Sequence, residues 1–302
     1  IKLPGRTPAS IGMKRPPADA SKMVTLTMSP MPNRISAGVD REGSFDNSIV
    51  AHEWGHYLHL RLATCTAPQC GAMSEGWGDS VAMMLGVRQG DNLDGTYALG
   101  QYALAATGDA AYYGVRRFPY SVDQTKNPLT FIDISSNQEL PTGAPINPSL
   151  AGSDNSEAHN AGEVWGAMLF EGFIALLKQS QASGARYTFE EARRRMADYV
   201  VAGLVLVPDN ATYTEQRDAI LAAANAADPQ DAVLLAQAFA TRGAGTCAVS
   251  PARLSSTLDG VVEDFSVRSL PTLTSITVDD SVSSCDQDGV LDAAERGKLT
   301  VK

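Results

Sequence analysis

The sequence is short of histidine, basic charge and long apolar runs. Its 302 residues include only 4 histidines, and 24 basic residues stand against 34 acidic ones, which gives a formal net charge of -10. This acidic balance argues against nucleic acid or an anionic membrane as the main partner. Apolar residues never continue for the roughly 18 positions that a membrane-spanning helix needs, so no membrane span is predicted.

Signals for a secretory leader and for covalent catalysis are also missing. The first residues, IKLPGRTP, lack the apolar core of a signal peptide. They indicate either a cytosolic protein or a chain from which the signal has been removed. There is no GxSxG elbow, no glycine-rich phosphate loop and no catalytic cysteine with its base, so a covalent intermediate is not expected.

Cysteine is scarce, with 4 residues and no CxxC spacing. Cys65 and Cys70 flank a short proline-containing loop that a local disulfide can close, which favours an oxidising, extracellular setting. The alternative is four free thiols. Cys247 and Cys285 form a second candidate pair, which would tie the C-terminal segment to the domain before it.

What the sequence does contain is NSIVAHEWGHYLHL, from Asn47 to Leu60. We expect a helix here, capped by Asp46 or Asn47. Within it, HExxH places His52 and His56 on one helix face, where two imidazoles can hold one zinc ion. Glu53 lies beside the first ligand and is placed to take a proton from a metal-activated water. The alternative is a solvated helix with two surface histidines.

A second acidic motif follows in GAMSEGWGDSVAMMLG. We expect Ser74 to cap a second helix, on which Glu75 and Asp79 share a face. The eighteen residues between His56 and Glu75 are enough to finish one helix and return beside it. Glu75 is therefore the expected third zinc ligand, and Asp79 the expected acceptor for the outer nitrogen of a ligating histidine. The alternative for Glu75 is a glutamate favoured by the helix dipole.

The two remaining histidines differ in their expected roles. His159 stands near the start of a long apolar helix, close to Asp154 and Glu157. There it can stabilise an oxyanion while a neighbouring acid orients it, although a lone histidine at a helix start is more often a local hydrogen-bonding residue. His59 is not expected to bind the zinc, because the further histidine of three-histidine metalloproteases is missing after it.

Four ordered blocks resemble the fungalysin-type (M36) metallopeptidases, which are relatives of thermolysin. These blocks are DNSIVAHEWGHYLHLRL, MSEGWGDSVA, FPYSVDQTKNPLTF and EAHNAGEVWGAML. The resemblance implies zinc ligands at His52, His56 and Glu75, a catalytic base at Glu53 and a transition-state histidine at His159. It also implies an α+β fold, a thermolysin-like zincin catalytic domain with an N-terminal sheet edge and a mainly helical C-terminal lobe.

The chain departs from this family before the motif helix. Only 51 residues precede His52, whereas the family usually carries a longer, largely sheet-forming part there. We expect that this part either is reduced here or lies outside the given chain, which would leave the N-terminal part of the domain incomplete. Precursors of the family also carry an inhibitory propeptide, which is an expected partner. The role of the tyrosines near the third block, Tyr112, Tyr113 and Tyr120, is left open beyond a place near the cleft.

Other segments predict structural elements. Residues 22–28, KMVTLTM, alternate with period two and predict a strand, which either pairs with an extended substrate or serves as an ordinary sheet strand. Three amphipathic helices with solvated charged faces are expected at Phe189–Leu206, Thr214–Ala226 and Pro229–Thr241.

The composition changes near Ser266. We expect a catalytic domain over residues 1–265 and, over residues 266–302, a linker with the start of a β-sandwich-like domain. An acidic turn in this segment is a candidate calcium site, formed by Asp286, Asp288, Asp292 and Glu295. Its spacing departs from an EF-hand, and the alternative is a plain turn.

These features predict a secreted zinc endopeptidase that acts on proteins or peptides. One alternative is a gluzincin aminopeptidase, since the same spacing from HExxH to glutamate suits those enzymes. Their GAMEN motif stands upstream of the first histidine, however, and the only GAM here is downstream, at Gly71–Met73. Another alternative is a non-catalytic adhesion or binding module with a structural metal. Glu53 argues against it, because a structural site needs no base.

Overall fold

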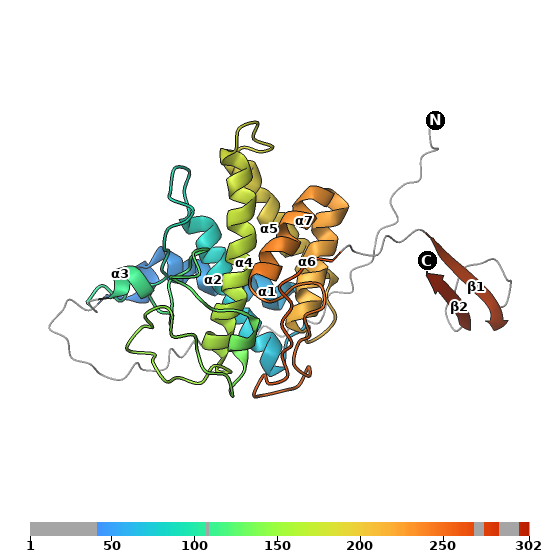
Figure 1. Ribbon diagram of the computed structural model, residues 1–302, viewed down its shortest axis with the longest axis horizontal. Helices are drawn as coiled ribbons and strands as arrows, with labels where there is room; N and C mark the ends of the chain where they lie inside the picture. The colour runs from blue at the N-terminus through green and yellow to red at the C-terminus, as the bar shows by residue number, and fades with distance from the viewer. Residues whose placement is uncertain (1–40, 107–108, 269–274, 284–295, 302) are drawn as a thin grey trace. The chain divides into compact units, whose positions relative to one another are not determined.

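The computed structural model describes residues 41–106, 109–268, 275–283 and 296–301. Within these ranges the protein is mainly helical, with a small antiparallel sheet near the C-terminus (Figure 1). The strand predicted at residues 22–28 and the four acidic residues of the calcium turn lie outside the described residues, as does Cys285. No helix among the described residues is long and apolar enough to cross a membrane.

Helix α4 (Ala158–Gln181) is the centre of the helical part (Figure 1). It contacts α2 (Pro68–Gly86), α5 (Phe189–Leu206) and α7 (Pro229–Thr241). Aromatic side chains fill the space between these helices. Trp165 of α4 meets Trp77 edge to face at a centroid distance of 5.4 Å and stacks on Phe239 at 5.8 Å. This core fixes α2, which carries the predicted acidic ligand.

Helix α1 (Asn47–Leu62) packs along α2. It begins where predicted, because the Asp46 side chain accepts a hydrogen bond from the backbone N–H of Ser48 at 3.0 Å. The two helices approach through glycine: a Cβ atom on Gly55 would lie 2.7 Å from the Cα of Gly78. Their backbones are therefore in contact at the level of the HExxH motif.

The C-terminal helices agree closely with the sequence prediction. Helices α5 and α7 have the predicted bounds, and α6 runs Tyr213–Ala227. Their charges are not all solvated, which corrects the prediction. Asp231 is fully buried and accepts hydrogen bonds from two tyrosine hydroxyls, and buried Arg217 donates to the carbonyls of Ala244 and Gly245. These partners offset the desolvation of the charges.

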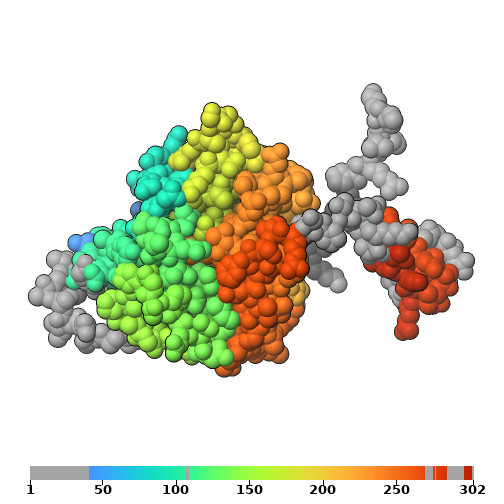
Figure 2. Space-filling model, in the orientation of Figure 1, coloured from blue at the N-terminus to red at the C-terminus, as the bar shows by residue number. Residues whose placement is uncertain are grey.

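Two largely irregular segments cover one face of the helices (Figure 2). The segment between α2 and α4 contains the short helices α3 (Ala110–Tyr113) and η2 (Phe131–Ile134), while η1 (Gly43–Phe45) precedes α1. The segment that follows α7 pairs with η2, since the Phe131 N–H donates to the Arg242 carbonyl at 2.9 Å. The first segment supplies the arginine and tyrosine that support the site described below.

The C-terminal sheet consists of β1 (Ile276–Ser283) and β2 (Arg296–Val301). They pair antiparallel, with Val278 opposite Leu299 and Asp279 opposite Lys298, and the register becomes irregular between Asp279 and Ser283. The predicted strand character of this segment is confirmed at this level; a β-sandwich-like domain stays a prediction.

Candidate metal centre

The three predicted zinc ligands come together between α1 and α2. The Nε2 atoms of His52 and His56 are 3.0 Å apart. Glu75 presents Oε2 at 3.3 Å from Nε2 of His52 and Oε1 at 3.5 Å from Nε2 of His56. We refer to these three residues as the ligand triad. Two consecutive helices thus bring two imidazoles and one carboxylate together, although eighteen residues separate His56 from Glu75 in the sequence.

The donor set fits a zinc ion. Zinc bound to nitrogen and oxygen at about 2.0–2.2 Å in tetrahedral geometry holds its ligand atoms about 3.3–3.5 Å apart. The separations within the ligand triad run from 3.0 to 3.5 Å. Three protein ligands also leave the fourth tetrahedral position open, as in catalytic rather than structural zinc sites.

The Nδ1 atom of each of the two histidines, which faces away from the other ligand atoms, has a hydrogen-bond partner. Nδ1 of His52 lies 2.7 Å from Oδ1 of Asp79, and Nδ1 of His56 lies 2.9 Å from Oγ of Ser74. When Nδ1 carries the proton and donates it to these oxygens, Nε2 offers a lone pair to a metal. The predicted position of Asp79 beside a ligating histidine is therefore what the structure shows, whereas its role remains a prediction.

Ser74 corrects the prediction for α2. The helix begins seven residues earlier than expected, at Pro68, because a proline at the first helical position lacks only an N–H that would have no helical partner anyway. Ser74 is consequently an interior residue, 8% exposed, whose hydroxyl meets His56 instead of capping the helix. Glu75 is likewise beyond the first turn.

Asp79 is in turn held by groups that the sequence did not predict. It is fully buried, and Arg116 donates to both of its carboxylate oxygens at 2.6 Å. The Tyr120 hydroxyl donates to it as well. Tyr120 is thus buried behind His52. Both residues come from the segment after α2, more than 35 positions along the chain, and no local periodicity marks them.

The charges and hydrogen bonds around Asp79 determine the protonation states of Asp79 and His52. Burial acts to raise the pKa of Asp79, but the Arg116 guanidinium and the hydrogen bond with His52 hold that pKa well below its usual range. Burial acts to lower the pKa of His52, but its hydrogen bonds with Asp79 and Glu75 outweigh it and raise the pKa to about 9 in the metal-free protein. An ionised Asp79 thus orients His52 at neutral pH.

His159 stands on the other side of Glu75. It lies in the first turn of α4, with Nε2 3.6 Å from Oε2 of Glu75 and Nδ1 2.7 Å from Oε1 of Glu157. Its side chain is 60% exposed. The hydrogen bond with Glu157 raises the pKa of His159. Of the two acids that the sequence placed near this histidine, Glu157 is the one that orients it.

Glu53 is half-buried on α1, directly beside His52. Its charge acts on His56, which places it near the ligand triad. The structure thus gathers every predicted catalytic and zinc-binding residue at the junction of α1, α2 and the start of α4.

The predicted disulfide between Cys65 and Cys70 is present, and Cys247 is exposed and free. The short tie between Cys65 and Cys70 joins the loop after α1 to the first turn of α2. It lies beyond the ligand triad, toward the C-terminal end of α1.

Residues 23–248 match the family model described as fungalysin metallopeptidase (M36). Among curated relatives, Extracellular metalloproteinase 2 of Arthroderma gypseum is 30% identical over 227 residues, 70% of this chain and 32% of the relative. Extracellular metalloproteinase 2 of Trichophyton rubrum is 31% identical, with 70% and 32% coverage. Extracellular metalloproteinase MEP of Neosartorya fischeri is 31% identical, with 68% and 31% coverage. The chain spans about a third of the length of these relatives.

Proposed function

The chain belongs to the fungalysin (M36) metallopeptidase family, and we propose that it is a secreted zinc endopeptidase that hydrolyses internal peptide bonds of proteins. Membership of the family implies peptide hydrolysis with zinc. The relatives are named extracellular metalloproteinases, which supports secretion. Because the chain spans a third of those relatives, its activity, substrates and location are proposals.

One observation carries this proposal. The two Nε2 atoms of the HExxH histidines and the carboxylate of Glu75 converge within 3.5 Å, while the Nδ1 atom of each histidine is engaged by its own partner. An accidental pair of surface histidines has no reason to be oriented in this way. A carboxylate, Glu53, also stands beside the triad, as a hydrolytic centre requires.

In this proposal His52, His56 and Glu75 hold the zinc, and Asp79 and Ser74 keep the two imidazoles in place. Bound there, zinc supplies a Lewis acid that polarises the scissile carbonyl and makes a water more acidic. Glu53 takes the proton from that water and returns it to the leaving amine.

His159 has a separate role in the proposed reaction. Its exposed Nε2 edge can donate a hydrogen bond to the oxyanion that develops on the carbonyl, and the hydrogen bond from Nδ1 to Glu157 favours the protonated ring. A raised pKa keeps a larger fraction of the rings protonated at neutral pH, so that Nε2 carries a proton to donate. The hydrogen bond to the oxyanion forms as the carbonyl is attacked and therefore acts on the transition state.

The test is hydrolysis of an internally quenched peptide blocked at both ends, by the intact zinc-loaded protein and by Glu53→Gln. We expect both proteins to hold one zinc per chain. Only the parent should cut at an appreciable rate, because loss of a general base costs about 10²–10⁴-fold in kcat. Exposed Glu139 offers a matched control, and Glu139→Gln should cut like the parent.

Other outcomes would replace the proposal. If both proteins hold zinc and neither cuts, the metal is structural and a binding module becomes the better interpretation. If cleavage requires a free N-terminus on the peptide, the protein is an aminopeptidase. Direct counting of bound zinc by elemental analysis separates either result from simple loss of the metal.

A further inference from the structure

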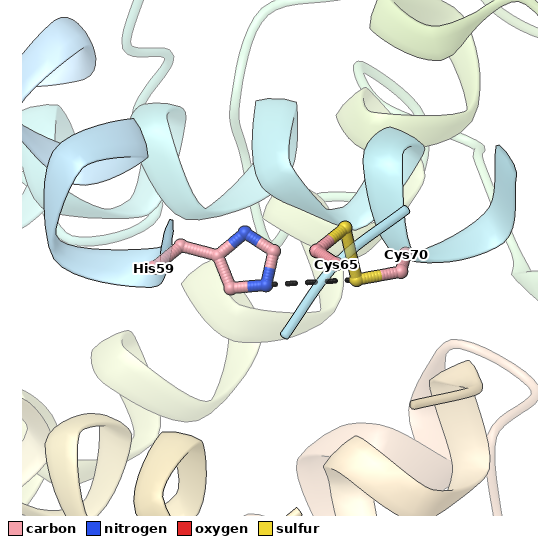
Figure 3. A group of neighbouring side chains, drawn as sticks. All are labelled: His59, Cys65 and Cys70. Atoms are coloured by element: carbon pink, nitrogen blue, oxygen red, sulfur yellow. Dashed lines mark hydrogen bonds between the residues drawn. A yellow bond between two sulfur atoms is a disulfide. The ribbon is translucent and has the colours of Figure 1, made fainter. Parts of the chain in front are cut away.

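A second group of metal-binding side chains lies one turn beyond the ligand triad. His59 of α1, Cys65 of the loop and Cys70 of α2 each offer one nitrogen or sulfur atom, and these atoms lie within 4.8 Å of one another (Figure 3). We refer to these three residues as the cysteine corner. The proposed peptidase chemistry uses none of them.

The two ring nitrogens of His59 make few hydrogen bonds in this corner. It is 1% exposed, and its Nδ1 atom has no hydrogen-bond partner among the described residues. Its Nε2 atom is 3.8 Å from Sγ of Cys70, whose sulfur is a weak hydrogen-bond partner (Figure 3). Burial lowers the pKa of His59 to about 4, so the ring is neutral near pH 7. Neutral imidazole is the form that binds metals.

The spacing of these side chains also suits a metal. Four residues separate Cys65 from Cys70, which is within the range of cysteine pairs in zinc sites. In a tetrahedral zinc site, sulfur and nitrogen ligands lie about 3.6 Å apart and two sulfurs about 3.8 Å apart. The distance from Cys70 Sγ to His59 Nε2 is already 3.8 Å. All three donor atoms lie within 4.8 Å of one another, and the two bonded sulfurs must separate before both can bind one ion.

We propose that reduction of the Cys65–Cys70 disulfide converts the cysteine corner into a second metal site, in which two thiolates and the His59 imidazole bind Zn²⁺ or a similar thiophilic divalent cation. Cys65 is half-buried rather than sealed, so a reductant and an ion can reach the pair. This site is separate from the ligand triad and does not depend on the peptidase proposal.

The chemistry balances with a low-molecular-weight thiol as the reductant. Two thiol molecules donate two electrons and two protons to the disulfide, which yields two cysteine thiols and one external disulfide. Binding of the divalent cation then displaces the two thiol protons into solvent. An external low-molecular-weight disulfide reverses the reaction: it accepts the two electrons from the thiolates and is reduced to two thiols, while the protein S–S bond re-forms and the ion is released.

The proposed ion preserves the connection that the disulfide makes. The disulfide links the loop that follows α1 to the first turn of α2, and His59 adds a direct contact from α1. Bound by all three side chains, the ion would link the same two helices through coordination bonds. The corner would thus stay closed under both oxidising and reducing conditions, provided that metal is present.

Cobalt(II) tests this proposal, because thiolate ligands give it a charge-transfer absorption in the near ultraviolet that nitrogen and oxygen ligands do not. The intact protein, with Cys247→Ser and Cys285→Ser to remove the other thiols, is stripped of metal and titrated with cobalt. A trialkylphosphine reduces the disulfide to two thiols and is itself oxidised to the phosphine oxide, with oxygen from water, so it replaces the thiol and leaves no competing thiolate. We expect one more cobalt per chain in the reduced protein than in the oxidised protein, together with the thiolate band.

Two variants show whether all three side chains of the cysteine corner bind the ion. Cys65→Ser should abolish the extra cobalt and its band, and His59→Gln should weaken the extra binding at least tenfold, with circular dichroism confirming that each variant is folded. An equal cobalt count in the oxidised and reduced proteins overturns the proposal. Extra cobalt that keeps its affinity in His59→Gln also overturns it, since the cysteines alone would then form the site. If His59→Gln fails to fold, the Cys65→Ser result decides.

Discussion

The ligand triad and the cysteine corner join the same two helices but hold their histidines in different ways. In the triad, each imidazole has a hydrogen-bond partner for Nδ1, namely Asp79 or Ser74, and its Nε2 atom faces the other ligands. In the corner, His59 is buried, and its Nδ1 atom has no hydrogen-bond partner in the part of the chain that the structure describes. The histidine with outer partners is already oriented for a metal.

Different interactions stabilise the cysteine corner and the ligand triad. An unpartnered buried polar atom costs about 1–3 kcal/mol, and closing a loop as short as that between Cys65 and Cys70 contributes about 2 kcal/mol through the unfolded state. The covalent bond therefore offsets the poor hydrogen bonding of the corner. In the triad, orientation comes from the network of Asp79, Arg116 and Tyr120 instead.

The largest expected effect on zinc binding comes from a substitution that displaces one histidine of the ligand triad without replacing any of its three residues. A Cβ atom on Gly78 would lie 2.5 Å from Nδ1 of His52, so Gly78→Ala must displace that ring. Zinc affinity should fall by more than roughly 100-fold, since loss of a ligand exceeds the 10- to 100-fold cost of losing its hydrogen-bond partner. Competition with a chromophoric chelator measures it.

Gly71 provides the matched control on the same helix. A Cβ atom there would meet nothing within 4 Å. Gly71→Ala should leave zinc affinity unchanged and raise the free energy of unfolding by up to about 1 kcal/mol through helix propensity. Equal zinc affinity in Gly71→Ala and Gly78→Ala would contradict the close approach of α2 to His52.

A smaller loss of zinc affinity is expected when the hydrogen-bond partner of a histidine Nδ1 atom, Asp79 or Ser74, is replaced. Asp79→Asn should lower zinc affinity by about 10- to 100-fold, because a neutral amide replaces the ionised acceptor of the His52 N–H, and Arg116 keeps, among the described residues, only its 3.5 Å ion pair with Glu75. Ser74→Ala should cost less, since a neutral hydroxyl holds His56 more weakly than a carboxylate does. Calorimetric titration with zinc ranks the two, and the reverse order would contradict this account.

The smallest expected effect is the pH dependence of stability, which can be measured without a substitution by comparing His52 with His59 in the metal-free protein. The pKa of His52 is raised from 6.5 to about 9, so its contribution to stability is complete below pH 6.5 and is lost as pH rises through 9. The pKa of His59 is lowered from 6.5 to about 4, so its contribution is complete above pH 6.5 and is lost as pH falls through 4. NMR titration of the ring protons measures both midpoints.

Midpoints that both lie near 6.5 would show that neither environment perturbs its histidine. Zinc gives an additional check on the same rings. Binding at neutral pH should release a proton from His52, because the ligand must be neutral, and should leave the midpoint of His59 unchanged. Proton release is measured from the buffer dependence of the binding enthalpy.

Local sequence signals predicted much of this arrangement. Asp46 before HExxH predicted the start of α1, and amphipathic spacing predicted α5 and α7. In the structure, Thr188 with Glu191 caps the start of α5, and Asp228 before Pro229 caps the start of α7. Each of these capping residues lies within three residues of the helix end that it fixes. Spacing and residue type also pointed to Glu75 and His159, and the resemblance to the family implies the same two residues.

What could not be predicted comes from distant parts of the chain. Arg116 and Tyr120 reach Asp79 from an irregular segment whose path no periodic pattern specifies. Ser74 has the residue type of a helix cap, yet its interior position follows from a helix that starts at Pro68 and from the need of His56 for an acceptor. Tertiary contacts decided both cases, and sequence spacing alone does not encode them.

The contact between Gly55 and Gly78 bears on which ions the protein accepts. Two backbones that already touch have no rotamers through which to adjust, so the distance between α1 and α2 is nearly fixed. The backbone positions from which Glu75 faces His52 and His56 are therefore held by main-chain contact. In the proposed zinc site, a cation of smaller radius would have to be accommodated by rotation of these three side chains, because α1 and α2 cannot move closer together.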